Sequence, residues 1–269
     1  MRQRTGTRRS IDVGAGVALM LAAALPAAAE TLTVKQVSQA LVKATPGHPA
    51  DFSHADLGGL DLSDLDFKGA KLIGADLLGA NLARANLAGA DLSGAKLDRA
   101  TITSTNFAGA DLSNASLFDI AAYSTTEFPK PAEAPNFAGA DLSGTHIQAR
   151  LTGVNMRGAD LSNARMGLAR EQLKSPIWHD LSGCDLTGAK LRNADLNGVH
   201  LQFTKLIGAD LTGANLRVAD LSYADLTGAI LTGTDLTGAD LDGTILRDAK
   251  GLTEAKGLND AKNRDKAVY

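Results

Sequence analysis

A large apolar residue recurs at every fifth position through most of this chain of 269 residues. One uninterrupted run of fourteen begins at Phe52 and ends at Leu117, and a second run of fourteen begins at Leu181 and ends at Leu246. A period of five fits neither the 3.6-residue turn of an α-helix nor the two-residue alternation of a long strand. The repeat therefore excludes a helical solenoid and predicts many short extended segments joined by turns.

Each repeat has a fixed order of residue types around its large residue, which we call position i. Position i−2 is nearly always small, i−1 is mostly Asp or Asn, i+1 is commonly Ser or Thr, and i+2 is commonly Gly. Side chains of a strand alternate between its faces, so i−2 and i point inward while i−1 and i+1 point outward. Glycine at i+2 then turns the chain, because it adopts positive φ without steric cost.

The repeats Ala90-Asp91-Leu92-Ser93-Gly94 and Ala209-Asp210-Leu211-Thr212-Gly213 resemble those of the pentapeptide-repeat family. The resemblance covers roughly residues 50–248. It implies an all-β fold, a right-handed quadrilateral β-helix in which four pentapeptides make a coil of twenty residues. The step from Leu117 to Phe137, across the first interruption of the repeat, is itself twenty residues and is consistent with such a coil.

The composition agrees with a narrow core. Only 4% of the residues are aromatic, and a large residue at i−2 would overpack a close-set interior. The single cysteine, Cys184, occupies an i−2 position, so we interpret it as a small buried residue. One cysteine also excludes an intrachain disulfide and a thiolate cluster for a metal.

Residues 1–29 have the pattern of a secretory signal peptide. Four arginines precede the apolar stretch 13–25, and a run of alanines ends at Ala29, ahead of Glu30. The stretch is shorter than the roughly 20 apolar residues that span a bilayer, so we expect cleavage between Ala29 and Glu30 and no lasting membrane span. The pair Arg8-Arg9 leaves both the twin-arginine and the general secretory route open. We therefore expect a periplasmic or secreted protein with a net charge of −6 after cleavage.

Caps and insertions interrupt the repeat. Residues 30–49 predict a helical cap with Thr33 as the N-cap, and residues 249–269 predict a polar helical or irregular cap at the other end. Residues 118–136, which contain Phe118, Tyr123 and Phe128, and residues 167–180, which contain Trp178, predict two inserted loops within the solenoid of residues 50–248. Each loop either packs on the rod or contacts a partner.

A twenty-residue coil stacks outward residues above one another. His200, Asp220 and Asp240 are all i−1 residues one coil apart, and Asp180 extends their column if the second insertion keeps the register. Phe203 and Tyr223 occupy i+2 positions, where glycine is usual. His200, Asp220, Asp240 and these two aromatic residues form the candidate interaction surface. A solvated face with an incidental ring pair and a metal site at His200 are the alternatives.

The sequence carries no catalytic signature. The five histidines are scattered, and no Gly-x-Ser-x-Gly or His-Glu-x-x-His motif occurs. We therefore expect no enzyme activity, no cofactor and no metal centre. The nearly balanced charge also argues against binding to nucleic acid.

Three functions follow from these observations. The first is a non-enzymatic exported scaffold that binds an unidentified protein of the bacterial cell envelope, with a homo-oligomer left open. The second comes from the resemblance: some pentapeptide-repeat proteins mimic DNA, bind DNA gyrase and protect it from quinolones, which requires a cytoplasmic location. The third is a surface that binds a metal or another small ligand.

Overall fold

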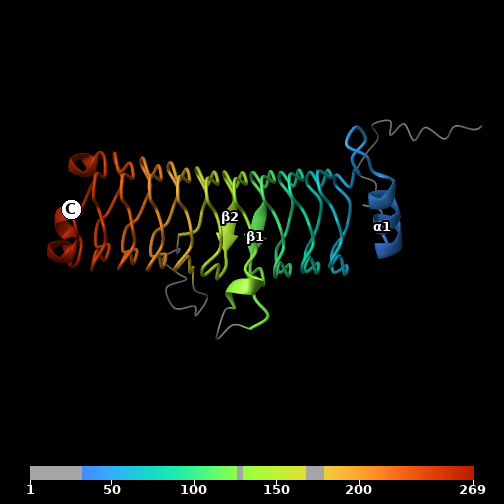
Figure 1. Ribbon diagram of the computed structural model, residues 1–269, viewed down its shortest axis with the longest axis horizontal. Coiled ribbons are helices and arrows are strands. Elements are labelled where there is room, and N and C mark those ends of the chain that lie inside the picture. Colours follow the sequence, from blue (N-terminus) through green and yellow to red (C-terminus); the bar gives the residue numbers. More distant parts are fainter. Residues whose placement is uncertain (1–31, 126–129, 168–178) are drawn as a thin grey trace, which may run out of the picture.

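The computed structural model describes residues 32–125, 130–167 and 179–269, which form one straight rod (Figure 1). Single-residue parallel β-bridges join successive coils at the i−1 positions, so the rod has four columns of outward residues. Column A contains Asp51, Lys71, Asp91, Asp111, Asp141, Asp160, Lys190, Asp210, Ile230 and Lys250. Column B contains Asp56, Asp76, Lys96, Ser116, His146, Arg165, Asp195, Asn215, Asp235 and Lys256.

The other two sides follow in the same way. Column C contains Asp61, Asn81, Thr101 and Ala121, joined in order by bridges, and after the first insertion Arg150, Asp180, His200, Asp220, Asp240 and Lys262, again joined in order by bridges. Column D contains Asp66, Asn86, Asn106, Asn136, Asn155, Asp185, Lys205, Asp225, Ile245 and Val268. Four columns of parallel bridges define a quadrilateral β-helix, so the predicted fold class is confirmed.

The repeat Asp91 to Ala95 shows why each residue type stands where it does. The Ala95 N–H donates to the carbonyl of Leu92 at 2.9 Å, which closes a turn, and Gly94 occupies the left-handed region at φ +65°. The Asp91 carboxylate accepts the Ser93 N–H at 3.1 Å and caps that turn. The aspartates at i−1 are therefore part of the fold and not only solvated surface charges.

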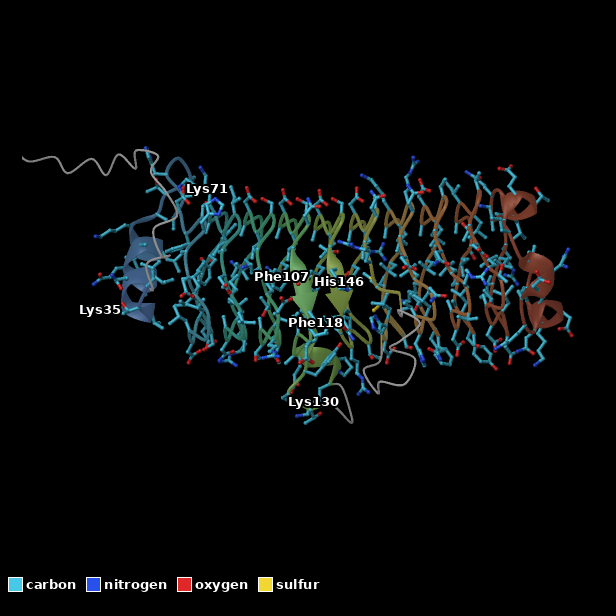
Figure 2. The ribbon with its side chains drawn as sticks, turned by 180° about the vertical axis from the view of Figure 1, so that it is seen from behind. Lys35, Lys71, Phe107, Phe118, Lys130 and His146 are labelled. Atoms are coloured by element: carbon cyan, nitrogen blue, oxygen red, sulfur yellow. The ribbon has the colours of Figure 1, made fainter. Side chains whose placement is uncertain are left out.

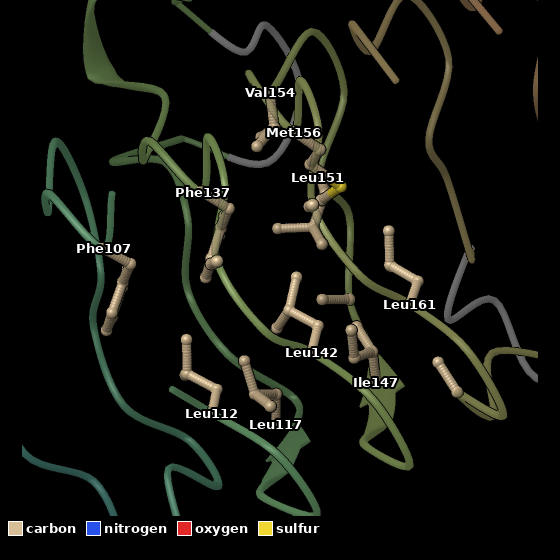
Figure 3. Close-up of a cluster of buried hydrophobic side chains, with 14 of the residues drawn as sticks. Phe107, Leu112, Leu117, Phe137, Leu142, Ile147, Leu151, Val154, Met156 and Leu161 are labelled. Atoms are coloured by element: carbon tan, nitrogen blue, oxygen red, sulfur yellow. The ribbon is translucent and has the colours of Figure 1, made fainter. Parts of the chain in front are cut away.

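Core side chains stack from coil to coil. The rings of Phe107 and Phe137 are parallel, with centroids 4.8 Å apart, about the spacing of neighbouring strands (Figure 3). Leu112 lies beside Leu142 in the same way. Threonine replaces alanine at five buried i−2 positions, and at four of them its hydroxyl donates to a leucine carbonyl 23 residues earlier in the chain. Those four threonines are Thr105, Thr204, Thr234 and Thr244.

The first insertion is shorter than the predicted 118–136. Ala121 still bridges Thr101, and the column resumes at Asn136, which bridges Asn106. Ile120 and Ala122 are both buried, so the repeat has a large residue at i−2 and a small one at i. This exchange of sizes hides the repeat from a search for large residues at every fifth position. Equivalent residues of the two coils are thirty residues apart here, so Phe137 stacks on Phe107. The step of twenty residues from Leu117 to Phe137 is therefore not one coil of the β-helix.

One residue is missing between Ile147 and Leu151, and the structure shows where. Two short strands, β1 (Ser116–Phe118) and β2 (His146–Gln148), pair in parallel with Leu117 opposite Ile147. After β2 the chain reaches the next side of the coil with one residue fewer than usual. Bridged residues of the neighbouring columns are therefore nineteen residues apart here, as Asn136 and Asn155 are. The missing residue thus belongs to the corner between columns B and C.

The second insertion also lies between columns B and C. Arg165 belongs to column B and Asp180 to column C, and the residues between them include 168–178, outside the described part of the chain. Both neighbouring bridges, Arg150–Asp180 and Arg165–Asp195, span thirty residues. The coil therefore regains its register after an insertion of ten residues.

A helix covers the first coil. Helix α1 (Val34–Lys43) begins at Thr33, whose side chain and that of Gln36 form a reciprocal capping box. Val37 is fully buried against the core. None of the helices in the described ranges is long and apolar enough to cross a membrane.

The C-terminal segment differs from the predicted polar tail, because it adds one more coil built from six-residue units. Lys256, Lys262 and Val268 bridge Asp235, Asp240 and Ile245. Each side of this coil carries a short 3-10 helix, namely η2 (Leu252–Glu254), η3 (Leu258–Asp260) and η4 (Arg264–Lys266). The extra residue per side accommodates the 3-10 turn.

Candidate interaction site

Column C brings together the predicted outward residues. Parallel bridges join Asp180 to His200, His200 to Asp220 and Asp220 to Asp240, so the second insertion keeps this register. Gln202 lies between two coils: its amide nitrogen donates to Asp220 at 2.6 Å, and its amide oxygen accepts from Ser182 at 2.7 Å. The column is therefore an ordered polar network.

Phe203 and Tyr223 stack at the corner between columns C and D, which we call the C–D corner. Their ring centroids lie 5.2 Å apart with an interplanar angle of 6°. Both residues have left-handed backbones, at φ 58° and 59°, and they are 64% and 55% exposed. The pair is an ordered aromatic surface on a rigid rod.

The first insertion leaves the rod at this same C–D corner, between Ala121 and Asn136. Figure 2 shows Phe118 beside His146, with ring centroids 6.4 Å apart, and Lys130 out on the insertion. Tyr123 is 8% exposed, and its hydroxyl donates to the Thr152 carbonyl. Burial raises the pKa of Tyr123. Tyr123 thus anchors the insertion to the rod and does not project as the predicted contact.

The short 3-10 helix η1 (Pro131–Glu133) fixes the other end of the insertion. The Glu133 carboxylate accepts the Ser124 N–H at 2.9 Å and the Ser124 hydroxyl at 2.7 Å, while the Glu133 carbonyl accepts the Ser104 N–H at 2.6 Å. The bonds from Ser124 lower the pKa of Glu133. The described part of the insertion is therefore packed on the preceding coil.

Four of the predicted residues lie outside the described residues. They are the cleavage residues Ala29 and Glu30 and the loop residues Phe128 and Trp178. Their roles stay predictions.

His179 precedes Asp180 at an i−2 position that most repeats fill with alanine. Its side chain is 5% exposed, and neither ring nitrogen has a hydrogen-bond partner among the described residues. Burial lowers the pKa of His179, the nearby Met166 backbone opposes this, and His146 lowers the pKa further. His179 lines a very small cavity with Ile147, Met166 and Val199, close to the missing residue in the preceding coil.

Cys184 and the acidic columns do not combine into a reactive or metal-binding cluster within the described ranges, where no three metal-ligating side chains converge. The Cys184 thiol is fully buried and donates to the Leu151 carbonyl at 2.9 Å. Burial raises the pKa of Cys184 to about 12. Cys184 thus takes the place of the core threonines, and its thiol is not poised for nucleophilic attack.

Two features of the columns were not predicted from the sequence. In column D an amide ladder runs from Asn155 through Asn136, Asn106 and Asn86 to Asp66, with each amide nitrogen donating to the side-chain oxygen one coil earlier. In column A four aspartates stand in succession, namely Asp91, Asp111, Asp141 and Asp160. Both could have been found by arranging the sequence in coils with the insertions removed.

Comparison with known proteins agrees with this architecture. The family described as pentapeptide repeats matches residues 50–87, 80–117, 135–169, 180–217 and 209–248. No curated protein matches the sequence.

Several solved structures are similar to the chain. HetL, a pentapeptide repeat protein involved in heterocyst differentiation regulation in the cyanobacterium Nostoc sp. strain PCC 7120, is 27% identical, with 88% of this chain and all of that chain covered and a TM-score of 0.47. The plasmid-mediated fluoroquinolone resistance protein QnrB1 is 20% identical, with coverage of 77% and 90% and a TM-score of 0.35. A pentapeptide repeat protein from the thylakoid lumen of Arabidopsis thaliana is 28% identical, with coverage of 45% and 70% and a TM-score of 0.26.

Proposed function

Since the chain belongs to the pentapeptide-repeat family, we propose that it is a non-enzymatic solenoid that binds another protein through the C–D corner around Phe203 and Tyr223. The observation that carries the proposal is the stacked, exposed ring pair. Exposed aromatic side chains held in one conformation are typical anchors of protein interfaces, because they bury a large area at little cost in entropy.

The backbone at the two rings supports this function. A left-handed φ costs a residue with a Cβ about 1–2 kcal/mol relative to glycine. Glycine occupies the same corner one and two coils earlier, at Gly183 and Gly153, and one coil later, at Gly243. Folding therefore does not require aromatic residues at these two positions, which supports a role in binding.

The positions of the two insertions also support a binding site beside column C. One leaves at the corner between columns C and D and the other at the corner between columns B and C, so column C lies between them. Figure 1 shows the described part of the first insertion on one edge of the rod, below β1 and β2. We propose that Phe128 and Trp178 extend the contact surface from these two insertions.

The proposal also includes export. The basic, apolar and small-residue pattern of residues 1–29 supports cleavage before Glu30 and a partner in the cell envelope. Cell fractionation with N-terminal sequencing of the mature protein tests this part. A periplasmic or secreted product that begins at Glu30 is expected, and a cytoplasmic product that retains Met1 would refute export.

A second candidate function is DNA mimicry directed at gyrase. It is favoured by the four successive aspartates of column A, of which Asp91, Asp111 and Asp141 form no ion pair within the described ranges. Gyrase supercoiling with and without a quinolone tests it. Protection of gyrase that is lost in the triple variant with Asp91, Asp111 and Asp141 changed to Asn would favour this function over envelope binding.

A further inference from the structure

We propose that the C–D corner binds an arginine-rich segment of the partner protein, with one guanidinium group stacked on the outer face of Phe203 and others bonded to the carboxylates of the following coils. This inference rests on the proposed function, since it names the chemistry of the partner at the same surface. It is carried by the direction of the rings, by the unpaired charges around them and by the free carboxylate oxygens.

Among the described residues of this corner, one aromatic face of the ring pair stays uncovered, and Phe203 is 64% exposed. A Cβ placed on Gly243 would lie 2.7 Å from Tyr223 Cδ1, so the Tyr223 ring leans over the next coil. Phe203 stacks on Tyr223 from the other side. The two preceding corner positions are Gly183 and Gly153, which have no side chain to cover the outer face of Phe203. A planar group can continue the stack there.

The charge around the pair is negative. Asp220 and Asp240 stand on the column C side, Asp225 stands on the column D side, and none of the three forms an ion pair with a lysine or arginine in the part of the chain that the structure describes. Lys205 precedes Asp225 in column D and Lys262 follows Asp240 in column C, so three carboxylates stand against two lysines. A cation on the outer face of Phe203 would be attracted by the ring, and further cations of the same segment would be attracted by the carboxylates of the following coils.

The carboxylates also have oxygens left for a partner. Asp225 Oδ1 accepts from Thr227, and Asp240 Oδ1 accepts from Asp242 and Asn263, whereas Oδ2 of either aspartate accepts no hydrogen bond from the described residues. Arginine suits this arrangement better than lysine, because a planar guanidinium can stack on the Phe203 ring and another can donate several hydrogen bonds to a carboxylate. The predicted partner is therefore an extended segment with exposed arginine.

Fluorescence anisotropy with three labelled peptides tests the inference on the full-length protein. The peptides consist of repeated Gly-Ser-Arg units, the same units with lysine, and the same units with citrulline, which keeps the shape of arginine but carries no charge. We expect the arginine peptide to bind most tightly and the citrulline peptide most weakly. Equal binding of the arginine and citrulline peptides, or no binding of the arginine peptide, would overturn the inference.

Three groups of variants locate the binding. Phe203→Gly and Tyr223→Gly restore the usual residue of a left-handed corner, and each should weaken arginine binding about two- to fivefold. Asp225→Asn keeps the turn cap but removes the charge and should also weaken binding, while Lys205→Gln should strengthen it. Val218→Gly is the control, because Val218 is an exposed apolar residue with positive φ on another corner. Equal loss of binding in Val218→Gly would refute the assigned site.

The same variants separate this inference from the proposed function. Photo-crosslinking from position 203 in cells reports whether any protein docks at the corner, whatever its charge. A crosslinked partner together with equal affinity for the arginine and citrulline peptides would refute the arginine preference and leave the docking function standing. Absence of a position-specific crosslink would refute the docking function itself.

Discussion

The Tyr223 ring lies over the backbone of Gly243, one coil further along the rod, with Cδ1 only 2.7 Å from the place of a Cβ on Gly243. The same relationship joins His54 to Gly74 and Val218 to Gly238. A side chain in the left-handed corner position therefore leans towards the C-terminal neighbour. That neighbour is either glycine or a residue that makes room for the side chain, as Tyr223 does by stacking with Phe203 and Arg84 does by pairing with Asp64.

The variant Gly243→Ala tests this geometry. The new methyl group would clash with the Tyr223 ring, and alanine is strained in the left-handed backbone of this position. We therefore expect the free energy of unfolding to fall by about 2–3 kcal/mol, measured by denaturant titration. In a Tyr223→Gly background only the backbone cost of about 1–2 kcal/mol should remain. Equal losses in the two backgrounds would contradict the contact.

The amide ladder of column D predicts that replacing an asparagine by aspartate lowers the stability of the fold. Asn106 donates to Asn86 at 3.1 Å and accepts from Asn136 at 3.1 Å, so Asn106→Asp removes the donor and keeps the acceptor. We expect a loss of about 1–3 kcal/mol at neutral pH, because two acceptors then face each other. The loss should shrink at acidic pH, where the protonated carboxyl can donate. A loss that does not change with pH would contradict this explanation.

The core position of Cys184 predicts which substitutions it tolerates. Cys184→Thr keeps a donor for the Leu151 carbonyl and should leave the free energy of unfolding within about 1 kcal/mol of the wild type. Cys184→Asp should prevent folding, because it buries an unpaired charge. A thiol reagent should modify the wild-type protein only as fast as it unfolds. Rapid modification of the folded protein would show that the thiol is accessible.

His179 predicts loss of stability on mild acidification. Its pKa is lowered in the folded state, so the unfolded chain binds the proton first as the pH falls below the ordinary value of 6.5. Stability should therefore be greatest above that pH and should fall below it by up to about 1.4 kcal/mol per pH unit. His146 and Asp180 are the titratable groups beside it, since His146 lowers its pKa and Asp180 lines the same cavity. His179→Ala should flatten the profile between about pH 7 and 5, measured by denaturant titration. An unchanged profile in this variant would refute the role of His179.

Much of the fold could be predicted from the spacing of the large residues, because each occupies a repeated place in one continuous core. The repeat at Ile120 and Ala122 could not be found in that way, since the two residues exchange sizes while the core volume stays filled. The last coil also does not follow from a period of five. Its bridged residues are six positions apart, so a five-residue period does not reveal them. They are Lys250, Lys256, Lys262 and Val268.

The candidate site was predictable only in part. The stacking of Phe203 on Tyr223 follows from their separation of twenty residues within an uninterrupted run of repeats. The burial of Tyr123 does not follow, because it depends on where the first insertion leaves the rod. Asp225 lies only two residues after Tyr223, but its lack of an ion pair with a lysine or arginine of the described residues could not be predicted, because it depends on the side chains of the neighbouring coils.

The most direct test of the central claim is photo-crosslinking in living cells with benzoylphenylalanine at position 203 and, as a control, at position 218. The account predicts a saturable adduct with an envelope protein from position 203, absent from position 218 and lost when Tyr223 is changed to Gly. The same adducts from both positions, or none from position 203, would contradict the claim that this corner is the docking surface.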